Sequence, residues 1–110
     1  MKLSEAMLKG IGDTVQTRVG YIDRHNNGRC AIACVLVGAF GVTNWDDLFD
    51  PTKGDTFKLI RETYPELDKR MEPPENTIPP GFGWDVIVRL NDNTEWTREQ
   101  IAEWLRSKGL

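Results

Sequence analysis

The chain has 110 residues, of which 39% are hydrophobic and 28% charged, and its formal net charge is -3. These values are typical of one globular domain, residues 1–110, and exclude a disordered or fibrous protein. An acidic chain without a cluster of Lys and Arg also lacks the electrostatic footprint of a nucleic-acid-binding protein, so we expect no nucleic acid as partner.

The first segment predicts a short helix over residues 3–10. Ser4 is the candidate N-cap, and Gly10 and Gly12 are expected to end the helix. The start of the chain has no apolar run of the kind that a secretory signal or a membrane anchor needs. We therefore expect a cytoplasmic protein that does not bind a membrane. Residues 13–21 match no template and are expected to form a loop or a short extended segment.

The chain is organised around residues 30–40, eleven residues without a charge. This stretch is too short to cross a bilayer, which needs about 20 residues, so it must be enclosed by the rest of the fold. Its alanines, and Gly41 at its end, favour a helix over a strand. We predict a central helix over residues 29–40, and because it is apolar all round, other elements should cover it on several sides.

The middle of the chain predicts two helices followed by a long excursion. Residues 43–49 contain Trp45 on one apolar face of a short helical turn, and Asp55 or Thr56 caps the next helix. Residues 69–83 are rich in proline and should form an extended loop, which at this length is either functional or mobile.

The C-terminal part predicts two more helices. Residues 84–90 fit a strand or a helix, and we favour a helix because no partner strand is evident. Residues 91–94 should form a polar turn. Thr97 and Gln100 then form a capping box that begins the last helix. The expected fold is mainly α, a small bundle of about five short helices around the central helix, with a proline-rich loop.

Several runs of the sequence resemble small uncharacterised proteins in bacterial and phage genomes. The residues that carry the resemblance are Leu90-Asn91-Asp92 followed by Trp96-Thr97-Arg98-Glu99-Gln100-Ile101-Ala102-Glu103-Trp104, together with Leu3-Ser4-Glu5-Ala6 and Cys30-Ala31. The resemblance implies a short cytoplasmic domain of bacterial, phage or mobile-element origin. It implies no catalytic role and no ligand.

Cys30 and His25 are the candidate catalytic pair. A thiol at the first turn of a helix, next to Arg29, has its thiolate stabilised, and His25 could serve as its base. The alternative, which we favour, is that Cys30 and Cys34 are small buried residues one helical turn apart and remain reduced thiols. Cys30, Cys34 and His25 offer at most three donors, too few for a structural zinc site, so we expect no metal and no cofactor.

The candidate binding residues are two aromatic residues and two polar ones. Phe82 and Trp84 follow the proline-rich loop, and tryptophan at a surface marks binding hot spots, although all four tryptophans could instead belong to the core. Asn91 and Asp92 offer oxygen donors to a ligand, and otherwise serve to terminate a helix. We expect a non-enzymatic interaction module that binds a protein partner or a second copy of itself. The alternative is a thiol-dependent enzyme that uses Cys30 and His25.

Overall fold

The computed structural model describes residues 1–18, 20–23, 26–42 and 55–110, and these residues are largely helical. Their elements in chain order are α1 (Leu3–Ile11), β1 (Val15–Gln16), β2 (Ile22–Asp23), β3 (Gly28–Arg29), α2 (Ala31–Phe40), α3 (Thr56–Thr63), the 3₁₀ helix η3 (Pro65–Asp68), β4 (Arg70–Met71), β5 (Gly81–Phe82), α4 (Gly83–Asn93) and α5 (Arg98–Ser107). The expected mainly helical fold is confirmed, and short strands accompany the helices. The expected helical turn over residues 43–49, with Trp45, lies outside the described residues.

The central helix α2 begins two residues later than predicted. Residues 28–29 pair as β3 with two neighbouring strands, parallel to β1 and antiparallel to β2. Cys30 is the N-cap, and its sulfur accepts a hydrogen bond from the backbone N–H of Ala33. Gly41 ends the helix in the left-handed conformation, as its position in the sequence predicted. Every residue from 31 to 36 is buried, so α2 is the interior element that its uncharged sequence requires.

Helices α1 and α2 pack backbone against backbone. A Cβ added to Gly10 would lie 1.7 Å from the carbonyl oxygen of Cys34, and one added to Gly38 would lie 1.9 Å from that of Ala6. Gly12 is the C-cap of α1, as predicted. The prediction that Gly10 also ends the helix was wrong, because Gly10 lies within α1 and lets the two helices approach. Ser4 is not the N-cap either, since α1 begins at Leu3 and the side chain of Ser4 is buried.

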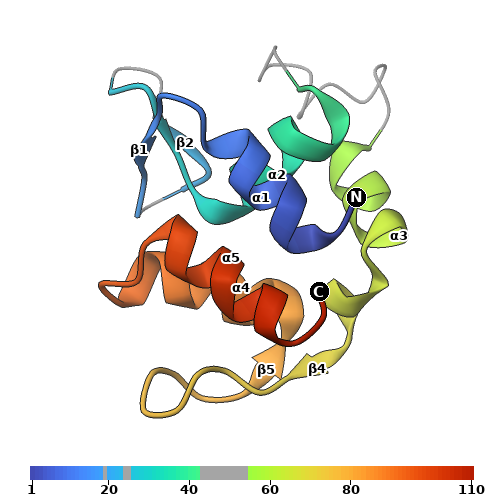
Figure 1. Cartoon of the computed structure of the whole chain (residues 1–110), viewed down its shortest axis with the longest axis vertical. Coiled ribbons are helices and arrows are strands. Elements are labelled where there is room, and N and C mark those ends of the chain that lie inside the picture. Colours follow the sequence, from blue (N-terminus) through green and yellow to red (C-terminus); the bar gives the residue numbers. More distant parts are fainter. Residues whose placement is uncertain (19, 24–25, 43–54) are drawn as a thin grey trace.

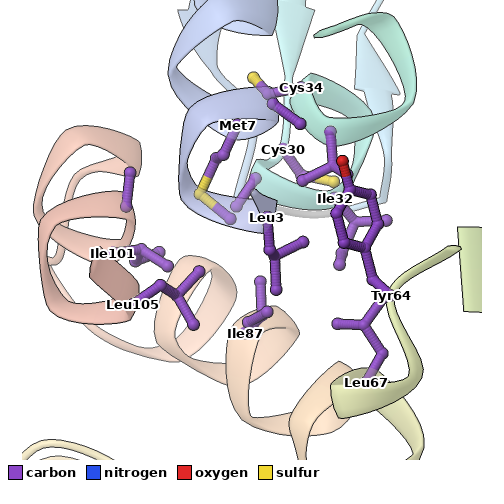
Figure 2. Close-up of a cluster of buried hydrophobic side chains, with 14 of the residues drawn as sticks. Leu3, Met7, Cys30, Ile32, Cys34, Tyr64, Leu67, Ile87, Ile101 and Leu105 are labelled. Atoms are coloured by element: carbon purple, nitrogen blue, oxygen red, sulfur yellow. The ribbon is translucent and has the colours of Figure 1, made fainter. Parts of the chain in front are cut away.

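The hydrophobic core lies between α1 and α2 on one side and α4 and α5 on the other (Figure 1). Figure 2 shows side chains from all of these helices converging, together with two residues from the segment that follows α3. The labelled residues are Leu3, Met7, Cys30, Ile32, Cys34, Tyr64, Leu67, Ile87, Ile101 and Leu105, all of which are buried. Apolar area removed from water in this cluster is the main source of stability for a chain of this size.

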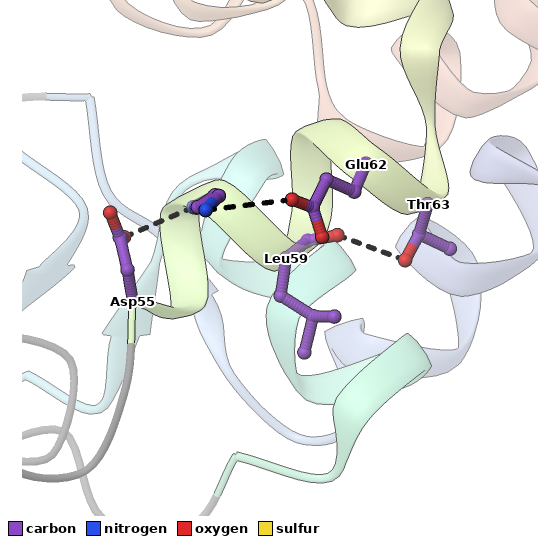
Figure 3. Close-up of polar contacts among 5 residues, drawn as sticks. Asp55, Leu59, Glu62 and Thr63 are labelled. Atoms are coloured by element: carbon purple, nitrogen blue, oxygen red, sulfur yellow. Dashed lines mark hydrogen bonds and ion pairs between the residues drawn. The ribbon is translucent and has the colours of Figure 1, made fainter.

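Helix α3 lies along the edge of this core and has a polar outer surface. Asp55 caps it by accepting a hydrogen bond from the backbone N–H of Lys58 at 3.0 Å, and Lys58 pairs with Glu62 one turn later (Figure 3). Ile60 faces the core. Leu59 projects away from these polar contacts and is 45% exposed.

The two ends of the proline-rich loop lie side by side, because they pair with each other as strands β4 and β5. The strands are antiparallel, with Arg70 opposite Phe82 and Met71 opposite Gly81. The chain then enters α4 directly at Gly83, which confirms the helix predicted over residues 84–90. The polar turn predicted at residues 91–94 was wrong, because α4 continues through Asn93.

Candidate functional site

A pocket of about 160 Å³ lies where the start of α2 meets the end of α4. Its lining residues are Gly20, Tyr21, Cys30, Ala31, Ile32, Val88, Asn91 and Asp92. Three of the candidate residues, Cys30, Asn91 and Asp92, thus share one pocket although about 60 positions separate Cys30 from the other two. The fold brings them together because α2 and α4 pack against each other.

The side chain of Asn91 is saturated with hydrogen bonds inside the protein. Its Oδ1 accepts from the backbone N–H of Ala31 at 3.1 Å and from Nε2 of Gln16 at 3.0 Å. Its Nδ2 donates to the carbonyl of Thr17 at 2.7 Å and to Oδ1 of Asp92 at 2.8 Å. An amide offers two donors and two acceptor lone pairs, so Asn91, which is 1% exposed, has none left for a ligand. Its role in this geometry is to join α4 to α2 and to β1.

Cys30 is 5% exposed, and its environment favours the neutral thiol. Burial raises the pKa of Cys30 to about 12, and the hydrogen bonds from the Ala33 and Ile32 backbone amides lower it only in part. The proposed base, His25, lies outside the described residues. Cys30 and Cys34 are both free thiols, and Figure 2 shows their sulfur atoms directed to different sides of α2.

Arg98 is a buried polar residue that the sequence analysis missed. It is 4% exposed, and its guanidinium donates to the carbonyl and the hydroxyl of Thr14 at 2.7 and 2.8 Å and to Sγ of Cys34 at 3.6 Å. Burial raises the pKa of Cys34, and Arg98 lowers it in part. The sequence contained one signal that Arg98 makes such contacts. A cation in the first turn of a helix interacts unfavourably with the helix dipole, so it needs a compensating contact elsewhere.

An aromatic cluster adjoins the pocket through Tyr21. The ring of Tyr21 lies 5.5 Å from that of Phe57 and 6.5 Å from that of Trp84, measured between ring centroids. The guanidinium of Arg61 lies 4.8 Å above the Trp84 ring, within the range of a cation–π interaction. The three described tryptophans, at positions 84, 96 and 104, are all half-buried, so none of them is a pure core residue.

Phe82 lies two residues before Trp84 in the chain and is exposed at the molecular surface. It precedes α4 by one residue and is 59% exposed, the second most exposed of the large hydrophobic residues that the structure describes. On α4 itself, Trp84, Val88 and Asp92 recur every four residues and therefore share one face of the helix. This side of α4 runs from Trp84 in the aromatic cluster, at the start of the helix, to Asp92 in the pocket, at its end.

In the described residues no three His, Cys, Asp or Glu side chains come close enough together to hold a metal ion. The same part of the chain contains no helix with the length and apolar character that crossing a membrane requires.

Comparisons with protein-family models, with curated proteins and with solved structures found no match. The assignment of function therefore depends on the geometry of the chain itself.

Proposed function

We propose that the protein is a non-catalytic interaction module that binds a protein partner through an aromatic face. We define the aromatic face as Phe82, Trp84, Phe57, Tyr21 and Arg61. The observation that carries the proposal is the position of Phe82, a large apolar side chain exposed at the first residue before α4.

Phe82 occupies a position where stability favours another residue type. It is the N-cap of α4, and no side-chain hydrogen bond caps the helix there. Ser, Thr, Asp and Asn are preferred at N-caps. A residue whose side chain cannot accept a hydrogen bond from a backbone N–H of the first turn lowers the stability by about 1 kcal/mol. An exposed phenylalanine at this position costs stability without serving the core, and local departures of this kind are expected at functional positions.

The neighbouring aromatic residues supply a rigid platform for a partner. Trp84 is held by Phe57 at 5.8 Å, by Tyr21 and by the Arg61 guanidinium, so its ring loses little further freedom when a partner binds. Tryptophan, tyrosine and arginine are the residue types that most often dominate the free energy of protein–protein binding. The aromatic face combines all three with the exposed Phe82, which lies two residues before Trp84 in the chain.

The thiol-dependent enzyme receives less support from the same geometry. A nucleophilic cysteine needs a lowered pKa and access to its substrate, whereas Cys30 is buried and its pKa is raised. Its sulfur already serves as the cap of α2. A structural role for Cys30 is therefore part of the proposal.

Site-specific photo-crosslinking in the native host tests the proposed function. A benzophenone amino acid replaces Phe82 in one variant and Leu59, which is exposed on α3, in a matched control. We expect a discrete covalent adduct with one partner at position 82 and none at position 59, and mass spectrometry then identifies the partner, including a second copy of this chain. The absence of an adduct at position 82, or the same set of adducts at both positions, would contradict the proposal.

A further inference from the structure

We propose that the pocket between α2 and α4 binds a small organic amine, whose ammonium group pairs with Asp92 and whose apolar body fills the pocket. The pocket shares Tyr21 with the aromatic face but does not include Phe82, and this proposal does not depend on the protein-binding role.

The volume of the pocket sets the size of the ligand. A buried apolar cavity of about 150 Å³ holds one benzene molecule. The pocket here has about 160 Å³, and its lining residues include Ala31, Ile32, Val88 and Tyr21. It is reached from solvent, since Gly20 is exposed and Asp92 is half-exposed at its border. A single aromatic ring, or a branched aliphatic group of the same size, is the apolar body that fits.

The polar atoms of the pocket determine the chemistry of the ligand, and most of them are already occupied. The Asn91 amide makes four internal hydrogen bonds, and the Cys30 sulfur accepts from the Ala33 amide. Asp92 differs from both, because its carboxylate accepts one hydrogen bond, from Asn91, and forms no ion pair with any residue that the structure describes. A carboxylate has about four acceptor positions, so Asp92 can still bind a donor.

A cation fits this pocket better than an anion does. Helix N-termini commonly bind anions, but the first amides of α2 are taken by Asn91 and by Cys30. The carboxylate of Asp92 would also repel an anion. Arg18, the cation that binds this end of α4, directs its guanidinium to the backbone carbonyls of Asn91, Glu95 and Trp96.

The charge of an ammonium group adds to its hydrogen bond with Asp92. A protonated amine carries a charge opposite to that of the carboxylate, and a charge-assisted hydrogen bond is about twice as strong as a neutral one. A neutral alcohol of the same shape could use only a hydrogen bond to Asp92.

Titration of the full chain with benzylamine, followed by amide chemical shifts in NMR spectra, tests the proposal. We expect saturable shifts of the Ala31, Ile32 and Val88 amides in the wild type, weaker binding of benzyl alcohol, and weaker binding still of benzoate. In Asp92→Asn the dissociation constant for benzylamine should rise at least about tenfold, since a hydrogen bond to a charged group contributes about 1.5–3 kcal/mol. The matched control is Asp85→Asn, which removes one carboxylate from the exposed side of α4 and should bind benzylamine as the wild type does.

Benzylamine titrations of two further variants test the proposal even if Asp92→Asn does not fold. Val88→Phe places a larger side chain in the pocket and should abolish the shifts. Phe82→Ser should leave the affinity for benzylamine unchanged, because Phe82 does not line the pocket. No saturable binding of benzylamine to the folded wild type would overturn the proposal. Equal affinity of the wild type for benzylamine and benzyl alcohol, or an unchanged affinity in folded Asp92→Asn, would overturn it as well.

Discussion

Asn91 caps the central helix from a distance of 60 positions, since its Oδ1 accepts a hydrogen bond from the backbone N–H of Ala31 at 3.1 Å. The end of α4 thereby satisfies a donor that the first turn of α2 would otherwise leave buried and unpaired. Arg98 joins segments in a similar way, since its guanidinium donates to Thr14 and to Sγ of Cys34. In this structure Asn91 and Arg98 therefore hold segments of the fold together.

Replacing Asn91 should destabilise the protein strongly. In Asn91→Leu the Ala31 amide and the Thr17 carbonyl lose their partner, and each buried polar group left unpaired costs about 1–3 kcal/mol. We expect the free energy of unfolding to fall by about 2–5 kcal/mol in urea titrations. Asn93→Ala, at an exposed position of the same helix, is the control and should change it by less than about 0.5 kcal/mol. Similar values for the two variants would contradict the structural role of Asn91.

The close approach of α1 and α2 predicts that replacing Gly38 destabilises the protein. The Cβ of Gly38→Ala would lie 1.9 Å from the carbonyl oxygen of Ala6, so the helix backbones would have to separate. Overpacking of this kind costs about 1–3 kcal/mol, and a contact with backbone should reach the upper end of that range. Gly81→Ala is the control, because its Cβ would meet only the flexible end of Arg89 at 3.6 Å. Urea unfolding of both variants checks the prediction, and a Gly38→Ala protein as stable as the control would refute it.

The buried thiol of Cys30 makes stability depend on pH in the alkaline range. Its pKa is about 12 in the folded state against 9.0 for an ordinary thiol, so above pH 9 the unfolded chain releases a proton that the folded chain retains. Stability is therefore complete below pH 9 and falls as pH rises, by up to about 1.4 kcal/mol for each pH unit between 9 and 12.

Comparison with Cys30→Ser isolates this effect. Serine at position 30 keeps an N-cap acceptor for α2 and does not titrate, so the stability of this variant should fall less steeply between pH 9 and 10.5, a range of about 1.5 pH units in which the loss applies. Burial also raises the pKa values of Cys34 and Tyr64, but these groups are present in both proteins and cancel in the difference. Parallel stability curves, or rapid alkylation of Cys30 in the folded wild type at pH 8, would favour the thiol-enzyme alternative.

Phe82→Ser should leave the fold intact or make it slightly more stable. The phenyl ring is 59% exposed, so its removal sacrifices little burial, and serine is a preferred N-cap for α4. We expect the free energy of unfolding to stay the same or to rise by up to about 1 kcal/mol. Thermal and urea unfolding check this, and a loss of more than about 1 kcal/mol would show that Phe82 serves the fold instead of a partner.

The sequence predicted those features that depend on residues close together in the chain. The capping box of Thr97 and Gln100 forms as expected, with the Gln100 amide N–H donating to the Thr97 hydroxyl at 3.1 Å. Asp55 caps α3, and Gly41 ends α2. In each case the pattern occupies a single helical turn, so local chemistry alone determines the result.

The features that the sequence did not predict depend on partners far along the chain. Gly10 was expected to end a helix, because only the packed structure shows that α2 requires a glycine there. Asn91 was expected in a polar turn, since three of its four hydrogen-bond partners come from two distant segments, residues 16–17 and the start of α2. The fold brings Cys30, Asn91 and Asp92 to one pocket, but hydrogen bonds within the described part of the chain occupy the Asn91 amide and the Cys30 sulfur.

The most direct test of the proposed function is the affinity of the crosslinked partner, purified and titrated calorimetrically against wild type, Phe82→Ser and Leu59→Ser. We predict that Phe82→Ser weakens binding at least about tenfold, since hot-spot residues contribute more than about 1.4 kcal/mol, and that Leu59→Ser binds as the wild type does. Unchanged affinity in folded Phe82→Ser would contradict the aromatic face as the binding surface.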